Sequence, residues 1–137
     1  MMYNALIEDC FFQPKHVGSI DLSLPLAVHS RKGNTNSNII DLYMQCNDKG
    51  FIERICFKSN GNPYIIAGLE WLCRQLTASF LPDLVLPDYQ LLVEKLEIPT
   101  NQYPVALQIE GVFKEALVLM KKKLRGIGHE CGNATCG

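Results

Sequence analysis

The residues best suited to chemistry stand close together near the end of the sequence: His129, Cys131 and Cys136. Imidazole nitrogen and thiolate sulfur are ligands for zinc, iron and copper, and two thiols can also close a redox disulfide. Zinc sites usually combine two pairs of ligands, so a fourth ligand would have to come from elsewhere in the chain or from a second subunit. Two interpretations stay open: a metal or redox site in the tail, or a flexible glycine-containing tail with incidental cysteines.

The remaining cysteines fit a reduced, buried state. Each lies in a segment that reads as apolar, and we expect small buried hydrophobes at Cys10, Cys46, Cys56 and Cys73. The opening MMYNALIEDC lacks the basic region of a secretory signal. No apolar stretch reaches the roughly 18–20 residues that a membrane span needs. The sequence therefore predicts a cytoplasmic protein with reduced thiols and no membrane partner.

Composition and net charge argue against some classes of partner. The chain has 137 residues, a net charge of −1 and 47% hydrophobic residues, which fits one ordinary globular domain. Such a balance gives no general attraction to nucleic acid, so we expect no nucleic-acid partner. The basic run Lys121-Lys122-Lys123-Leu124-Arg125 has two interpretations. It can complement the dipole at a helix C-terminus, or it can form a docking patch for an acidic partner.

Hydrophobic periodicity predicts an α+β fold. Alternating apolar residues indicate two strands over 39–46 and 51–58, joined by a hairpin turn at Asn47-Asp48-Lys49-Gly50. A further short strand is expected over 24–29. Helical spacing predicts helices over 3–12, 64–76, 88–96 and from Pro104 or Val105 to Leu124. The expected architecture is a small three-stranded antiparallel sheet with helices packed on one face.

Several short stretches, in this order, resemble the iron-sulfur cluster scaffold proteins of the IscU and NifU N-terminal family. The matching stretches are Tyr3-Asn4, Pro14-Lys15-His16-Val17-Gly18, Asn47-Asp48-Lys49-Gly50-Phe51-Ile52-Glu53, Phe57-Lys58 with Gly61 and Ile66-Ala67, and Leu96-Glu97-Ile98-Pro99. The resemblance covers about residues 3–124. It implies an IscU/NifU-N-like domain over 1–125, followed by a Gly/Cys-containing tail over 126–137.

The resemblance also implies where an iron-sulfur cluster would be held. In the family, three cysteines at three loop tips supply thiolates, assisted by an aspartate and a histidine. At these positions this sequence has Asn36-Ser37-Asn38, Asn62 and Pro104-Val105. An amide oxygen is a hard, neutral ligand and valine is none, so we expect no cluster at the usual site. Asn36, Asn38, Asn62, Pro104 and Val105 would instead form a polar, uncharged interaction surface.

These expectations combine into one functional hypothesis and two alternatives. No G-x-S-x-G motif or phosphate-binding loop is present, and His16 and His29 are expected as isolated turn or surface residues, so an enzyme is not predicted. The first hypothesis is a non-enzymatic regulator or adaptor related to cluster assembly, with a cysteine desulfurase or another assembly component as partner. The alternatives are a zinc or iron-sulfur carrier that uses His129, Cys131 and Cys136, and an adaptor in an unrelated complex that kept only the fold.

Overall fold

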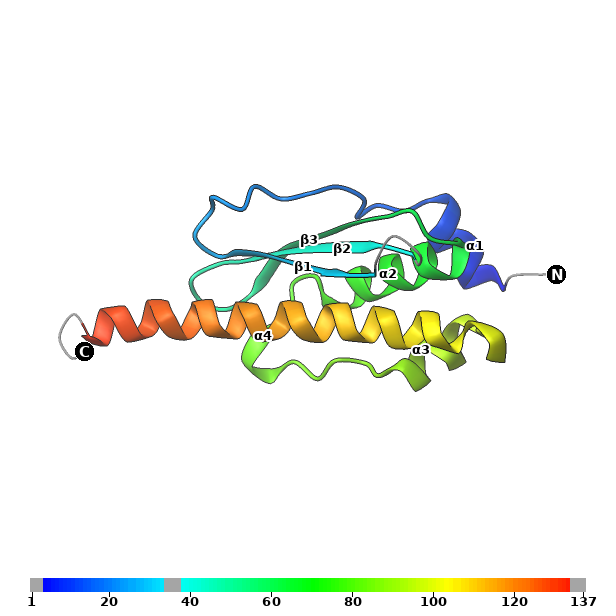
Figure 1. The fold of residues 1–137 in the computed structure, drawn as a ribbon. Coiled ribbons are helices and arrows are strands. Elements are labelled where there is room, and N and C mark those ends of the chain that lie inside the picture. The colour runs from blue at the N-terminus through cyan, green and yellow to red at the C-terminus, as the bar shows by residue number, and fades with distance from the viewer. Residues whose placement is uncertain (1–3, 34–37, 134–137) are drawn as a thin grey trace.

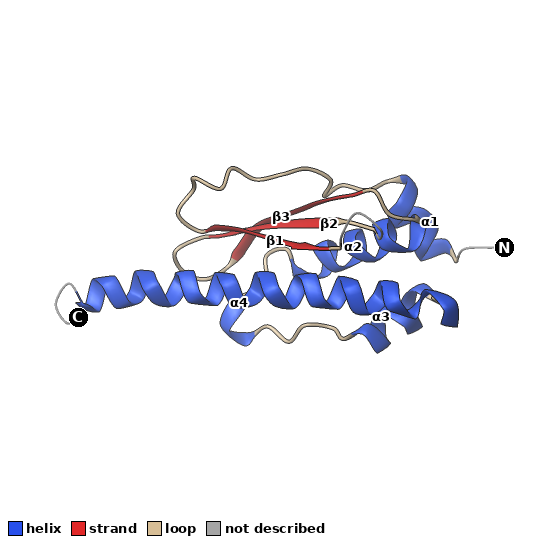
Figure 2. Ribbon diagram, viewed as in Figure 1, coloured by secondary structure: helices blue, strands red, loops and turns tan. Residues whose placement is uncertain are grey.

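A three-stranded antiparallel sheet forms the centre of the molecule. The computed structural model describes residues 4–33 and 38–133, with side chains as far as residue 126. The sheet has the order β1 (Ala27–Lys32), β2 (Ile40–Cys46) and β3 (Ile52–Ser59). Helices account for most of the other described residues: α1 (Ala5–Phe12), α2 (Pro63–Leu76), α3 (Tyr89–Leu96) and α4 (Tyr103–Asn133), with short 3-10 turns η1 (Leu81–Asp83) and η2 (Thr100–Gln102). The predicted fold class is confirmed (Figures 1 and 2).

The alternation in the sequence decides which face of the sheet is buried. Along β2 the residues Ile40, Leu42, Met44 and Cys46 are buried, whereas the intervening residues are partly exposed. Leu42 is the partner of Ser30 in β1 and of Phe57 in β3, so the buried rows of the three strands coincide. Because side chains alternate between faces, this register gives the sheet one apolar face. The predicted hairpin turn is confirmed, and Gly50 in it has φ +94°.

Helices α2 and α4 cover that apolar face. Both helices contact the sheet, while α1 packs on α2 and α3 packs on α4. One apolar stripe of α4 lies in the core: Val105, Ile109, Val112, Phe113, Ala116, Leu117 and Met120. In Figure 1, α4 runs as a long rod along the whole sheet, with α3 beneath it. Among the described residues no helix is long and apolar enough to cross a membrane.

The two outer edges of the sheet differ. The edge of β3 is bonded twice: residues 16–18 exchange backbone hydrogen bonds with Phe57 at 2.8 and 2.9 Å, and residues 78–79 do the same with Ile52. The outer edge of β1 has no such neighbouring strand in the part of the chain that the structure describes. The sheet is therefore closed along one side and open along the other.

Three predicted boundaries are wrong, and one of them is the end of the first strand, which continues past the predicted His29 to Lys32. The first strand begins at Ala27, because residues 24–26 lie in consecutive turns closed by bonds from Leu24 N to Asp21 O and from Ala27 N to Leu24 O. The last helix continues past the predicted end at Leu124 to Asn133. No proline interrupts this stretch, and isolated glycines lower helix propensity without ending a helix.

Candidate functional site

Three loop ends meet at one end of the sheet, opposite the hairpin. They are residues 38–39 before β2, the corner 59–62 between β3 and α2, and residues 100–105 at η2 and the start of α4. We call them the three-loop end. The first two loops are joined directly, since Ile39 N donates to Asn60 Oδ1 at 2.9 Å and Ser59 Oγ donates to Ile39 O at 2.8 Å.

Asn62 connects the corner to the start of α4. Its side-chain oxygen accepts from Ile65 N at 3.1 Å and so caps the N-terminus of α2, with Pro63 in the first turn. Asparagine before proline is a favoured way to begin a helix, because the cap satisfies a free backbone N–H and proline needs none. The amide nitrogen of Asn62 donates to Gln102 Oε1 at 2.9 Å. Both ends of this side chain are thus engaged in holding the loops together.

A third amide closes the connection. Gln108 Nε2, one turn into α4, donates to Asn38 O at 2.7 Å. The corner is therefore bonded to both other loops, and the first loop is bonded to α4 just beyond the third. Asn36, the residue at the first predicted position, lies outside the described residues.

The third predicted position divides between surface and core. Pro104 is exposed in the first turn of α4, whereas Val105 is only 7% exposed and belongs to the hydrophobic core. Helical spacing explains this, because Val105 stands four residues before Ile109 on the same buried stripe. The expectation that Val105 contributes to an interaction surface is therefore corrected.

A comparison with known proteins finds a similar sequence. The iron-sulfur cluster assembly scaffold protein IscU of Buchnera aphidicola subsp. Acyrthosiphon pisum (strain APS) is 26% identical over 125 residues, which cover 90% of this chain and 98% of that protein. The chain is IscU/NifU-like. No family model matches this IscU/NifU-like chain.

Two solved structures share the fold of the IscU/NifU-like chain. One is a putative iron-sulfur cluster assembly scaffold protein for the SUF system from Fervidobacterium islandicum AW-1, with a TM-score of 0.63 and 14% identity over 84% of this chain and 96% of that one. The other is the N-terminal part of a nitrogen-fixing NifU-like protein from Brucella abortus, with a TM-score of 0.63 and 10% identity over 88% and 94% of the two chains.

The groups present at the three-loop end of the IscU/NifU-like chain do not suit an iron-sulfur cluster. Such clusters are held by thiolates, and none of the described cysteines lies in these loops. The oxygen of Asn62 is already used as a helix cap, and Val105 offers no donor atom. Within the described residues, no three side chains of His, Cys, Asp or Glu come together as a metal site.

Three of the four described cysteines are also poor ligands because they are buried. Cys10, Cys46 and Cys73 are buried, while Cys56 is partly exposed on β3. Burial raises the pKa of Cys10 and of Cys46 to about 11, and it raises the pKa of Cys73 well above its ordinary value. A thiol in an apolar environment stays protonated at neutral pH and is a weak nucleophile.

Charged residues border the three-loop end, contrary to the expectation of an uncharged surface. A shallow pocket of about 330 Å³ beside Asn60 includes Arg31, Asp41 and Lys58. Arg31 donates from Nε and Nη2 to the two oxygens of Asp41 at 2.8 and 3.1 Å. Hydrogen bonding from Arg31 is the largest cause that lowers the pKa of Asp41, and His29 adds to it. His29 is therefore paired, not isolated.

The structure contains a buried carboxylate that was not predicted from the sequence. Glu70 of α2 is fully buried and accepts four hydrogen bonds: from Lys15 N at 2.9 Å, His16 N at 3.0 Å, His16 Nδ1 at 2.8 Å and Arg74 Nε at 2.7 Å. Arg74 in turn donates to Asp9 Oδ2 at 2.7 Å. This network fastens α1 and the following turn to α2. The available signal was an acid among apolar residues, four positions before an arginine.

The side chains of the predicted tail site lie outside the described residues. His129 and Cys131 lie on the backbone of α4, in the part whose side chains are outside the described residues, and Cys136 lies outside them altogether.

Proposed function

We propose that this IscU/NifU-like chain is a non-enzymatic regulator or adaptor that holds no cluster at the usual position and binds a protein of the cluster-assembly system. A cysteine desulfurase is the partner we would test first. The observation that carries the proposal is the double engagement of Asn62, which caps α2 and bonds to Gln102. Asn62 stands where the resemblance places a cluster ligand, and its side chain joins two loops.

The three-loop end has the properties of a protein-binding surface. Asn60, Asn101 and Pro104 are exposed, and Tyr103 is 37% exposed. Tyrosine and amide side chains are effective in interfaces because they combine apolar area with hydrogen bonding. The hydrogen bonds between the loops hold this surface in shape, so little ordering is needed when a partner binds.

The test is a calorimetric titration of the full chain with a purified cysteine desulfurase. We expect binding that weakens about tenfold or more in Tyr103→Ala, as for a central aromatic contact. Val85→Ala is the matched control, because Val85 is 86% exposed on the loop before α3 and is not part of the three-loop end. Absence of binding, or equal loss in both variants, would overturn the choice of partner and surface.

Anaerobic reconstitution with iron and sulfide tests the other half of the proposal. We expect no stoichiometric cluster in the full chain. The alternative function, a zinc or iron-sulfur carrier using His129, Cys131 and Cys136, predicts bound metal that is lost in the double variant Cys131→Ser, Cys136→Ser. A cluster that survives that double substitution would contradict both readings and point back to the three-loop end.

A further inference from the structure

Within the described residues, the open edge of β1 has outward peptide groups that no neighbouring strand pairs with. Cys46 N donates to Leu26 O at 3.0 Å, which makes this pair a hydrogen-bonded one in the antiparallel ladder between β1 and β2. In such a ladder, every second residue turns its N–H and C=O toward the partner strand. The alternate residues Ala27, His29 and Arg31 therefore direct their peptide groups away from β2. The N–H of Ala27 is already bonded to Leu24 O, so the N–H groups available along this edge are those of His29 and Arg31.

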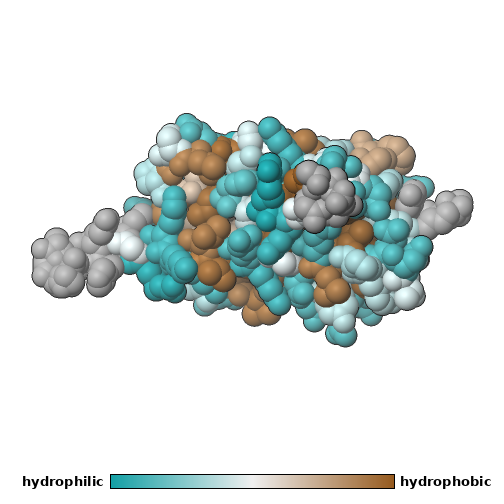
Figure 3. All heavy atoms as spheres, in the orientation of Figure 1, coloured by the Kyte–Doolittle hydropathy of each residue, from teal (hydrophilic) through white to brown (hydrophobic). Residues whose placement is uncertain are grey.

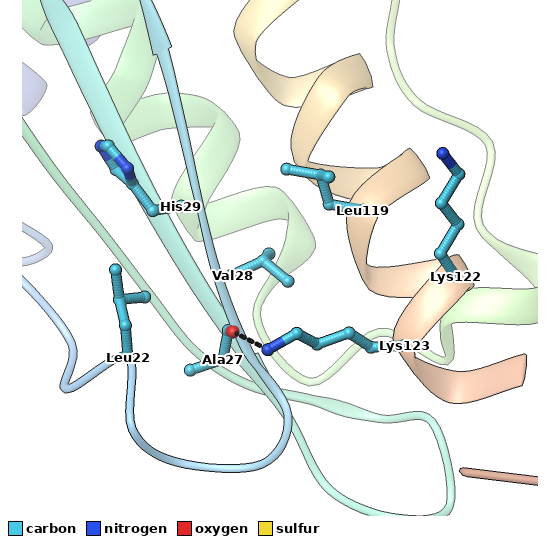
Figure 4. A pocket seen from close by; sticks show the side chains of 7 residues that line it. All are labelled: Leu22, Ala27, Val28, His29, Leu119, Lys122 and Lys123. Atoms are coloured by element: carbon cyan, nitrogen blue, oxygen red, sulfur yellow. Dashed lines mark hydrogen bonds between the residues drawn. The ribbon is translucent and has the colours of Figure 1, made fainter. Parts of the chain in front are cut away.

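A groove follows this edge. It has a volume of about 420 Å³ and lies between β1 and α4, lined by Leu22, Ala27, Val28, His29, Leu119, Lys122 and Lys123 (Figure 4). The floor is mostly apolar, and the polar groups stand at the sides. Figure 3 shows hydrophobic surface between the segment leading into β1 and the helix α4, bordered by hydrophilic surface.

One lysine occupies the edge. Lys123 Nζ donates to Ala27 O at 3.0 Å, across the groove from α4 (Figure 4). Proteins often protect an exposed sheet edge with lysine, because a charged group discourages unwanted strand pairing. This bond is replaceable: a strand added beside β1 can supply an N–H to Ala27 O, which leaves the ammonium group of Lys123 free to pair with a carboxylate.

The charges at the groove indicate the chemistry of its occupant. Its lining contains Lys122, Lys123 and His29 and no acidic residue. Lys32, at the end of β1, adds another cation, and its side chain passes the helix at Gly111. A second copy of the chain would bring the same cations to the contact, and like charges across paired strands are destabilising. An acidic occupant has the opposite effect.

We propose that the edge of β1 binds an acidic segment of a partner protein as an added strand. The peptide groups of His29 and Arg31, together with the carbonyl of Ala27, would pair with the backbone of the segment. Its apolar side chains would face the floor of the groove, and its carboxylates would face Lys122 and Lys123. Addition of a strand to a free edge takes affinity from backbone hydrogen bonds and specificity from alternate side chains.

The test uses a fluorescein-labelled peptide of about ten residues with alternating valine and glutamate, long enough to pair along β1. Fluorescence anisotropy with the full chain is expected to show saturable binding, absent for the same peptide with lysine in place of glutamate. Lys122→Glu and Lys123→Glu should each weaken binding by about fivefold or more. Lys121→Glu is the matched control, since it changes the net charge equally but lies outside the groove lining.

Strand pairing is tested separately from charge. A peptide methylated at alternate backbone nitrogens keeps its charges but cannot pair along one edge, and its affinity should fall at least tenfold when the pairing edge is blocked. His29→Pro, which removes an outward N–H, should weaken binding relative to His29→Ala, and the methylated peptide decides the matter if the proline variant does not fold. The proposal is overturned by no binding, by equal losses in Lys121→Glu and Lys123→Glu, or by indifference to methylation.

Discussion

Replacement of Asn62 by alanine tests the interpretation of the three-loop end most directly. Loss of an N-cap costs about 1 kcal/mol of unfolding free energy, and loss of one amide hydrogen bond costs about 1 kcal/mol more. Both are made by this side chain, at 3.1 Å to Ile65 N and 2.9 Å to Gln102 Oε1. We therefore expect Asn62→Ala to lower the free energy of unfolding by about 2 kcal/mol. Urea unfolding followed by fluorescence of Trp71, which is 7% exposed in α2, measures it.

Two further variants separate the two contributions. Asn62→Ser keeps a capping oxygen but cannot reach Gln102, and Gln102→Ala keeps the cap but removes the partner. Each should lower the free energy of unfolding by about 1 kcal/mol or less. When Gln102 is already alanine, adding Asn62→Ala should lower the free energy of unfolding only by the contribution of the N-cap. If Asn62→Ala costs no more than Gln102→Ala, or if Asn62→Ser is as harmful as Asn62→Ala, the account of this residue is refuted.

Three predictions concern the core. Glu70→Ala should lower the free energy of unfolding by about 3 kcal/mol, since it removes four hydrogen bonds and leaves part-buried donors unpaired; a urea-unfolding loss near 1 kcal/mol would contradict the role of the network. Gly68→Ala should cost about 1–2 kcal/mol in the same assay, because the added Cβ would stand 2.6 Å from Ile109 Cδ1, whereas Gly126→Ala, in open space, should be neutral or stabilising. Cys10, whose pKa is raised to about 11 by burial, should resist iodoacetamide at pH 8 until urea unfolds the chain; mass spectrometry reads the modified residue, and rapid native labelling would argue against its burial.

Local patterns were enough to predict most of the architecture. The alternation along β2 and the apolar stripe of α4 reflect burial on one face, and that burial is what the structure shows. The turn at Asn47–Gly50 was predictable because Asn and Gly supply the local hydrogen bonds and the positive φ that a tight hairpin needs. These elements are specified within a few residues of sequence.

Features that join distant segments could not be predicted in the same way. Glu70 bonds to Lys15 and His16 across more than fifty positions, and no local pattern connects these residues. Likewise, the spacing of Val105 allowed either a loop tip or a core position, and only the packing of α4 on the sheet places it in the core. The open edge of β1 also depends on where segments 16–18 and 78–79 lie, which is tertiary information.

The candidate site was predictable in position but not in its interactions. The resemblance identified Asn62 as the residue that replaces a ligand, and Asn followed by Pro also indicates a helix start. That its amide reaches Gln102 depends on how η2 packs against the corner, which the sequence does not reveal. The charged residues that border the three-loop end also depend on tertiary contacts, because adjacent strands bring Arg31 and Asp41 together.

The straight course of α4 has a consequence for assembly geometry. Tyr103 stands at the three-loop end and Lys123 at the groove, so one continuous helix connects the two surfaces (Figure 1). At 1.5 Å per residue, this stretch spans about 30 Å, roughly the diameter of a small domain. The helix would therefore hold two proteins bound at these places about one small-domain diameter apart. The length of α4 thus sets the distance between the three-loop end and the groove.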